Sequence, residues 1–144
     1  MALVQHVLDT KGNAVWTVSK DQTAHDAARL MHERHIGSVV VMNGDVILGI
    51  FTERDLMNRV VAEERDPKTT RVADVMTARI AICSRDTTLE SCRSAMTRHK
   101  IRHLPVVEDG KLLGIISSGD ILARELKDQE ETIRYLHEYM LGPN

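Results

Sequence analysis

Aromatic side chains, charge of one sign and long apolar runs are all scarce in this chain. Only 3% of its 144 residues are aromatic, and 19 basic residues nearly balance 21 acidic ones, for a formal net charge of -2. A platform for stacking bases needs several exposed rings, and a strongly basic surface is what draws a protein to nucleic acid or acidic lipid. No apolar run approaches the roughly 18 residues of a membrane-spanning helix. We therefore expect neither nucleic acid nor a membrane as a partner.

Cysteine is rare as well. Cys83 and Cys92 form neither a disulfide framework nor a zinc-binding set, which predicts two buried thiols in a reducing, cytoplasmic environment. The first residues lack the basic and apolar regions of a secretion signal. His25, His32 and His35 are spaced to share a helix face, but no cysteine or acidic set completes a metal site there. We expect no metal.

The chain repeats itself with an offset of 65 residues. The segment GIFTERDL at 49–56 returns as GIISSGDI at 114–121, and the same frame carries Met31 to Met96. No gap is needed between positions 17 and 120. Self-similarity at a fixed offset indicates one supersecondary unit that occurs twice.

Each copy is predicted to run strand, helix, strand, strand, helix. Alternating and β-branched runs predict strands, and apolar residues at helical spacing predict helices. The expected strands are 15–19, 38–42, 47–51, 80–84, 103–107 and 112–116, and the expected first helices are 23–34 and 88–99. A second helix begins near Thr52 and near Ser117. Because each copy has one sheet face to cover, we expect an α+β fold with the repeats packed sheet to sheet about a pseudo-two-fold axis, and a cleft between them.

The flanks complete the organisation. We expect an N-terminal flanking helix in 1–14, repeats at 15–62 and 78–128, a linker at 63–77 and a C-terminal helical extension at 129–144. The last helix should run from Asp120 to about Leu141, with Gly142 and Pro143 stopping it. A helix that long overhangs a small domain, so its far end packs either on a partner chain or on its own module.

These repeats resemble the cystathionine β-synthase (CBS) domain pair, or Bateman module. The likeness rests on GIFTERD at 49–55, GIISSGD at 114–120 and IRHLPVV at 101–107, and it covers about 15–122. It implies a stand-alone regulatory module that binds adenosine-containing ligands (AMP, ADP, ATP, NAD or S-adenosylmethionine) in the cleft. It also implies a homodimer that acts on an unknown protein target in trans.

Two motifs, Thr52-x-x-Asp55 and Ser117-x-x-Asp120, stand where a strand ends and a helix begins. The same spacing is typical of a helix-capping box, and Thr23-x-x-Asp26 shows it with no ligand required. Recurrence after a glycine-isoleucine pair favours a second role in the cleft. A carboxylate can accept both hydroxyls of a ribose, and a helix N-terminus suits phosphate.

The resemblance implies two pockets, each built around one aspartate. Pocket A is expected to contain Thr52, Arg54, Asp55, Gly37, Ser38, Ile80 and Ile82. Pocket B is expected to contain Ser117, Gly119, Asp120, Arg102, His103, Val15 and Thr17. In each pocket the aspartate holds the ribose, and the backbone at the first strand of the opposite repeat holds the adenine.

The two pockets should differ in phosphate preference. Arg102 and His103 of pocket B correspond to the uncharged Gly37 and Ser38 of pocket A, where Arg54 compensates. These basic residues favour AMP, ADP, ATP or NAD over S-adenosylmethionine, which is a cation without phosphate. If His103 contacts phosphate, affinity should rise as pH falls through about 6.5. A single tryptophan, Trp16, is expected to pack, with base stacking as the other option.

Three functions follow from these observations. The leading one is a sensor of adenine nucleotides that signals by conformational change. The alternative is a homodimeric interaction module whose pockets are vestigial. The third, a small enzyme, has little support, because the chain lacks a nucleophile-elbow motif, a P-loop and a dinucleotide-binding fingerprint.

Overall fold

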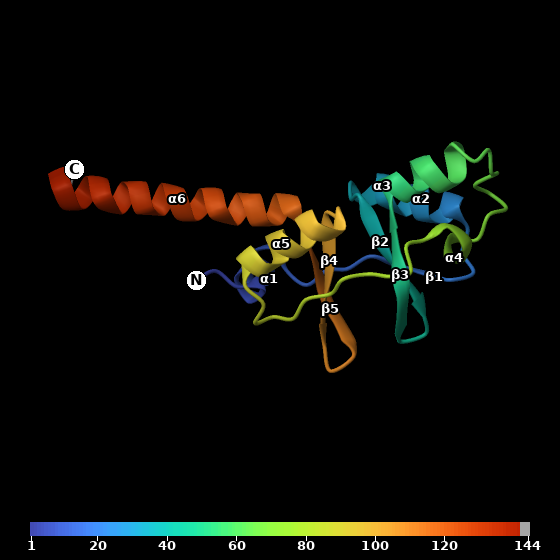
Figure 1. The fold of residues 1–144 in the computed structure, drawn as a ribbon, viewed down its shortest axis with the longest axis horizontal. Helices are drawn as coiled ribbons and strands as arrows, with labels where there is room; N and C mark the ends of the chain where they lie inside the picture. The colour runs from blue at the N-terminus through green and yellow to red at the C-terminus, as the bar shows by residue number, and fades with distance from the viewer. Residues whose placement is uncertain (142–144) are drawn as a thin grey trace.

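The computed structural model describes residues 1–141, so Gly142 and Pro143 lie outside the described residues. Figure 1 shows the elements in chain order. They are α1 (Val4–Lys11), β1 (Thr17–Ser19), α2 (Ala24–Arg34), β2 (Ser38–Asn43), β3 (Val46–Thr52), α3 (Glu53–Asp55), the π-helix η1 (Leu56–Val61), α4 (Val72–Val75), α5 (Leu89–His99), β4 (His103–Glu108), β5 (Lys111–Ser117) and α6 (Ser118–Leu141).

The repeat of the sequence is a repeat of the structure. Helix α5 follows α2, and the hairpin β4–β5 follows β2–β3, at the same offset of 65 residues. Both hairpins are antiparallel and carry an irregularity at the same place, between Val41 and Met42 and between Val106 and Val107. The two-copy α+β organisation predicted from the sequence is therefore confirmed.

The first strands of the two copies differ. Strand β1 pairs in parallel with β2, and the N–H of Val40 donates to the carbonyl of Trp16 at 3.1 Å. The strand expected at 80–84 is reduced to one parallel bridge between Cys83 and Val106. The residue equivalent to Val40 is Pro105, which has no N–H to donate to a neighbouring strand. The prediction of this strand was wrong because the proline removes its first ladder bond.

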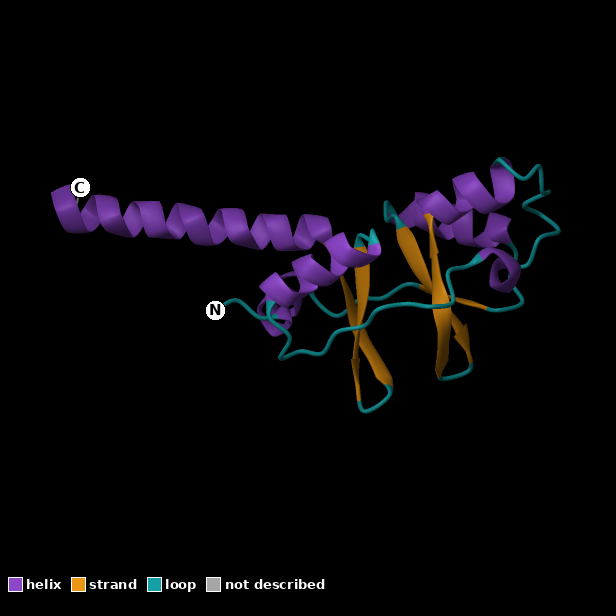
Figure 2. Cartoon of the chain, in the orientation of Figure 1, coloured by secondary structure: helices purple, strands orange, loops and turns teal. Residues whose placement is uncertain are grey.

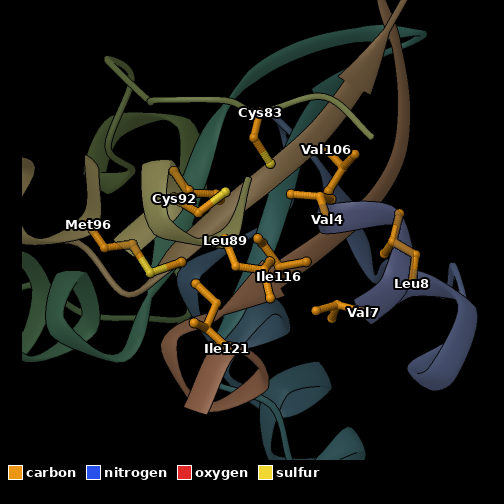
Figure 3. Close-up of a cluster of buried hydrophobic side chains, with 11 residues drawn as sticks. Val4, Val7, Leu8, Cys83, Leu89, Cys92, Met96, Val106, Ile116 and Ile121 are labelled. Carbon is orange, nitrogen blue, oxygen red and sulfur yellow. The ribbon is translucent and has the colours of Figure 1, made fainter. Parts of the chain in front are cut away.

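Each repeat has its own apolar core, and each core is completed by a short helix that precedes the other repeat in the sequence. Val72 and Val75 of α4, which precedes the second repeat, are buried in the core of the first. Val4, Val7 and Leu8 of α1, which precedes the first repeat, are buried in the core of the second. Figure 3 shows this second core, in which the thiols of Cys83 and Cys92 are also buried. The neighbouring Cys92 and burial raise the pKa of the Cys83 thiol, so the sulfurs act as core side chains.

The two hairpins stand in the middle of the molecule, with the helices of each repeat on their outer sides (Figure 2). Val39 and Val41 of β2 face the first core, whereas Val40 between them is fully buried yet belongs to neither core. Pro105, the equivalent residue of β4, is buried in the same way. Because successive strand residues point to opposite faces, these two residues lie on the inner faces of the sheets. The expected sheet-to-sheet arrangement is confirmed.

Helix α6 has 24 residues and projects far beyond the rest of the chain (Figure 1). Ile121 near its start is buried in the second core, but Ile133 and Tyr139 are 67% and 78% exposed. The far end of the helix therefore does not pack on its own module. Among the described helices, α6 included, none combines the length and hydropathy needed to cross a membrane.

Candidate functional site

A cleft of about 590 Å³ opens between the two repeats. Three stretches of chain line it: the end of β3 with the helix that follows, the linker segment around 77–81, and residues 99–103 at the entry to β4. The first belongs to one repeat and the third to the other, so the cleft joins both halves of the molecule. It brings together Gly37, Thr52, Arg54, Asp55 and Ile80 of the predicted pocket A.

Asp55 is the acidic centre of this cleft and is only 6% exposed. The backbone N–H of Thr52 donates to its Oδ2 at 3.0 Å, and its own N–H donates to the hydroxyl of Thr52 at 3.3 Å. This reciprocal pair is the predicted capping box. On the other carboxylate oxygen, Oδ1, the hydroxyl of Thr77 donates at 3.0 Å and Nε of Arg59 lies at 3.6 Å.

Thr77 reaches Asp55 because the linker runs directly against β3. The backbones of Ile50 and Thr77 exchange two hydrogen bonds, of 3.0 and 2.8 Å. Gly49 makes this approach feasible, since a Cβ at that position would collide with the carbonyl of Thr77. Sequence reasoning missed Thr77 because it lies outside both repeats; the glycine of the GIF motif was the signal that another backbone approaches there.

The walls of the cleft are basic. Five cationic side chains line it, against two carboxylates, those of Glu53 and Asp55. The five are Arg54, Arg59, Arg79, Lys100 and Arg102, and His99 and His103 join them. Because the whole chain carries a formal charge of -2, this concentration of positive charge is local. It favours an anionic ligand.

Arg54 spans the cleft. Its guanidinium Nη1 donates to the backbone carbonyl of Lys100 at 3.1 Å. Arg54 comes from the first repeat and Lys100 from the end of α5 in the second. A ligand that engages this arginine would therefore act on a contact between the two halves of the chain.

Arg102 and His103 lie differently from the sequence expectation. They were assigned to pocket B with Asp120, but both line the cleft that holds Asp55. The reason is geometric: β4 begins beside Gly37, where a Cβ would come within 3.6 Å of the imidazole Cε1 of His103. Burial lowers the pKa of His103 below its ordinary value, opposed by the nearby carboxylates of Glu53 and Asp120. The imidazole therefore lines the cleft and also lies within the electrostatic influence of Asp120.

The backbone of 78–82 is free of partners within the described residues 1–141: no backbone hydrogen bond joins it to another segment. This is the stretch that loses its strand because of Pro105. Ile80 and Ala81 from it line the cleft. Their N–H and C=O groups make no strand-to-strand hydrogen bonds. They can therefore offer the neighbouring donor and acceptor that the edge of a purine requires.

Two members of predicted pocket A lie elsewhere. Ser38 is buried and pairs with Thr52 across the hairpin β2–β3. Ile82 is 55% exposed. Neither contributes to the lining of the cleft.

The corner around Asp120 repeats the cap but not the surroundings. The N–H of Ser117 donates to Oδ2 of Asp120 at 2.8 Å, and the N–H of Asp120 donates to the hydroxyl of Ser117 at 3.1 Å. The ammonium of Lys11, the last residue of α1, lies 2.8 Å from the same Oδ2. Lys11 also donates to the carbonyl of Ile115 at 2.9 Å. Sequence reasoning missed Lys11, which lies in the flank.

Gly119, Thr17 and Val15 are further residues of predicted pocket B. Gly119 follows the cap on α6 and leaves its surroundings open. Thr17 is exposed in β1 and Val15 precedes it, half-buried. Trp16 lies between them under the guanidinium of Arg34, whose Cζ is 4.0 Å from the ring centroid. This cation–π contact agrees with the packing role expected for Trp16.

Comparisons with known proteins agree with this fold. The sequence profile of the CBS domain matches residues 9–62 and 72–127. The CBS domain-containing protein YhcV of Bacillus subtilis is 34% identical over 123 residues, which cover 85% of this chain and 87% of that protein. A solved structure of a protein with CBS domains from Burkholderia ambifaria is 41% identical, with a TM-score of 0.86, and covers 89% of this chain and 96% of its own.

A more distant likeness concerns a ligand. The CBS domain protein PAE2072 of Pyrobaculum aerophilum, solved in complex with AMP, has a TM-score of 0.73 and 22% identity, and covers 82% of this chain and 88% of its own. At that identity the likeness shows a shared fold. CBS domains are regulatory modules and generally not catalytic. With two matches that together span most of its length, this chain belongs to the CBS domain family.

Proposed function

We propose that this protein is a sensor that binds one phosphorylated adenine nucleotide (AMP, ADP, ATP or NAD) in the cleft around Asp55. The observation that carries the proposal is a buried carboxylate surrounded by basic side chains from both repeats. A ribose supplies hydroxyl donors for the carboxylate, and phosphates supply the negative charge that the walls favour. The AMP complex of a protein with the same fold supports this class of ligand.

Asp55 has capacity for a ribose despite its internal bonds. A carboxylate offers about four lone-pair sites, and Thr52 and Thr77 are its close partners. Arg59 stands at an ion-pair distance of 3.6 Å and is half exposed. A ribose hydroxyl can take the place of this arginine, which is then free to turn toward a phosphate.

The other two parts of the nucleotide fit the remaining walls. The backbone at Ile80 and Ala81 has unpaired donors and acceptors for the edge of adenine. Arg54, Lys100 and Arg102 lie where phosphate charge would be neutralised. S-adenosylmethionine, a cation without phosphate, fits these walls poorly.

We assign the nucleotide to the Asp55 cleft and not to the Asp120 corner. There the ammonium of Lys11 already takes the position of a donor on the carboxylate. A ribose would have to displace a charged group that also holds the carbonyl of Ile115. The second pocket of the sequence analysis is thus proposed to be closed by α1.

Signalling follows from the position of the ligand. A nucleotide bound between the repeats contacts both, and it competes for Arg54, which joins them. Binding would change how the repeats sit against each other. The proposed output is a homodimer that acts on a separate protein in the cytoplasm.

A thermal-shift screen with AMP, ADP, ATP, NAD, adenosine and S-adenosylmethionine tests the proposal. A ligand of the native state at a thousandfold excess over Kd stabilises by about 4 kcal/mol, on the order of 10 °C for a domain of this size. We expect this shift for at least one phosphorylated nucleotide, with no turnover. If none of the six compounds shifts the melting temperature, the cleft is vestigial and the interaction module is the better account.

A further inference from the structure

Helix α6 carries an unpartnered apolar seam along its solvent side. The seam positions recur at intervals of four, three, four, three and four residues. They are Leu122, Leu126, Gln129, Ile133, Leu136 and Met140. This is the heptad spacing of a coiled coil. The five apolar members are 49–77% exposed in the single chain.

The seam lies beside, and not on, the face through which α6 contacts the rest of the molecule. Ile121 and Glu125 are the positions that hold α6 to the body, through the second core and through an ion pair with Arg93 of α5. On a helical wheel Ile121 lies about 100° and Glu125 about 60° from the centre of the seam, so the body contacts one flank of the helix and leaves the seam exposed. The CBS match ends at residue 127, and from there the helix projects freely (Figure 1). The extension therefore contributes little to the fold that bears it.

We propose that the seam is an interface with a second copy of this chain, in which two α6 helices pair in parallel and in register. Gln129, the polar member of the seam, supports this choice. In a parallel pair it meets its own copy, and two amides can hydrogen-bond each other. In an antiparallel pair it would lie against Ile133 of the second copy, and a buried amide without a partner is costly.

The charges beside the seam are few. The positions that flank the seam, and meet across a parallel pair, carry two acids among the described residues, Glu125 and Glu130. In a parallel pair Glu125 meets Glu130 of the second copy, and the ion pair of Glu125 with Arg93 offsets part of this repulsion.

The size of the interface predicts its strength. Ten aliphatic side chains, five from each copy, bury on the order of 600–1,200 Å² at roughly 60–120 Å² each. This is the lower end of specific interfaces. We therefore expect a dimer that dissociates on dilution, and that forms with or without nucleotide.

Sedimentation of the full chain between about 1 and 200 μM tests the interface. Ile133→Asp places a charge in the seam, and Tyr135→Asp places the same charge on a residue of similar exposure off it (67% and 64%). We expect a concentration-dependent dimer for the unmodified chain and for Tyr135→Asp. For Ile133→Asp we expect dissociation at least about tenfold easier, with unchanged circular dichroism. A monomer at every concentration, or equal effects of the two variants, would overturn the proposal.

Crosslinking tests the orientation. Gln129→Cys should yield a disulfide-linked dimer under mild oxidation, because a parallel register places the two sulfurs in one layer. Tyr135→Cys should yield none, and the native Cys83 and Cys92 are buried. Failure of Gln129→Cys to crosslink in a sample that sediments as a dimer would overturn the parallel register. Nucleotide binding by Ile133→Asp should be unchanged, which separates this proposal from that of the sensor.

Discussion

Asp55 and Asp120 begin equivalent helices with the same cap, yet the third group at each carboxylate is different. Asp55 accepts a hydrogen bond from the neutral hydroxyl of Thr77, whereas Asp120 is paired with the ammonium of Lys11. Both partners come from the short helices that precede the repeats, or from the residues just after them. This third group is supplied by the flanks and not by the repeats.

The glycines that begin the repeated segments explain how the flanks reach the aspartates. Gly49 admits the backbone of Thr77, and Gly114 admits Leu8 of α1, which would lie 2.9 Å from a Cβ there. The same lack of a side chain thus brings a hydroxyl to one carboxylate and an ammonium to the other. The same corner geometry with a different neighbouring side chain is the basis for proposing that one corner is open to a ligand and the other closed.

A second difference concerns arginines one turn further on. Arg59 stands 3.6 Å from Asp55, but its equivalent, Arg124, pairs with Asp128 at 3.1 Å instead. The arginine of the first repeat is therefore poised at the cleft, and that of the second is directed along α6. We infer that duplicated units diverge in function through what packs against them.

The largest expected effect comes from Asp55→Ala. Removing a carboxylate that accepts two ribose hydroxyls, at about 1.5–3 kcal/mol for each charged hydrogen bond, should weaken nucleotide binding at least about 100-fold. Asp26→Ala is the matched control, because Thr23 and Asp26 form the same reciprocal cap at 3.1 Å away from the cleft. Both variants lose about 1 kcal/mol of capping. Titration calorimetry should find that only Asp55→Ala loses binding; equal loss would reduce the motif to a cap.

The next effect concerns the basic walls. Arg102→Ala should weaken binding of AMP about tenfold, as expected for a charge-assisted bond to phosphate. Binding of adenosine should change little. Arg98→Ala is the control, since Arg98 lies on the same basic stretch but outside the lining of the cleft. If Arg102→Ala weakens adenosine and AMP alike, Arg102 supports the fold of the site and not the phosphate.

A smaller effect is expected from pH. Burial lowers the pKa of His103, so the imidazole is neutral at pH 7 and binds a proton only below its ordinary value of about 6.5. A nearby phosphate favours the protonated form, so affinity for AMP should rise a few-fold as pH falls from 7.5 to 5.5. His103→Gln should flatten this part of the profile. A slope that persists in the variant would assign it to another group.

The smallest expected change is in stability, from Lys11→Met. The ion pair with Asp120 is partly exposed, and pairs of that kind contribute about 0–1 kcal/mol. Thermal unfolding should therefore shift little. Calorimetry at high nucleotide concentration should reveal a second, weaker equivalent once the ammonium is gone. A stoichiometry that stays at one would show that Lys11 does not close the corner.

Much of the fold could be predicted from the sequence, because the two repeats give the same order of elements independently. The hairpins and the helices that precede them follow from periodicity and turn residues in one frame. The strand at 80–84 is reduced to one bridge, since its composition favours a strand but Pro105 beside it has no N–H to donate and only accepts a bond from Cys83, at 3.0 Å. The loss of pairing depends on which segments become neighbours in the fold, and the periodicity of one segment does not predict its neighbours.

The part of the site that could be predicted is the part formed by residues of the repeated motif. Thr52, Arg54 and Asp55 lie in the cleft, as their place at a strand-to-helix corner suggested. Thr77 and Lys11 were missed because they act across a distance in the chain, through close packing at glycines. Their roles depend on tertiary packing, because α1 packs against the second repeat and α4 against the first.

The number of nucleotides bound per chain tests the central claim most directly. Titration calorimetry with AMP should give one equivalent for the unmodified chain and for Asp120→Ala, and no binding for Asp55→Ala. Two equivalents in the unmodified chain, or loss of binding in Asp120→Ala with retention in Asp55→Ala, would contradict the account.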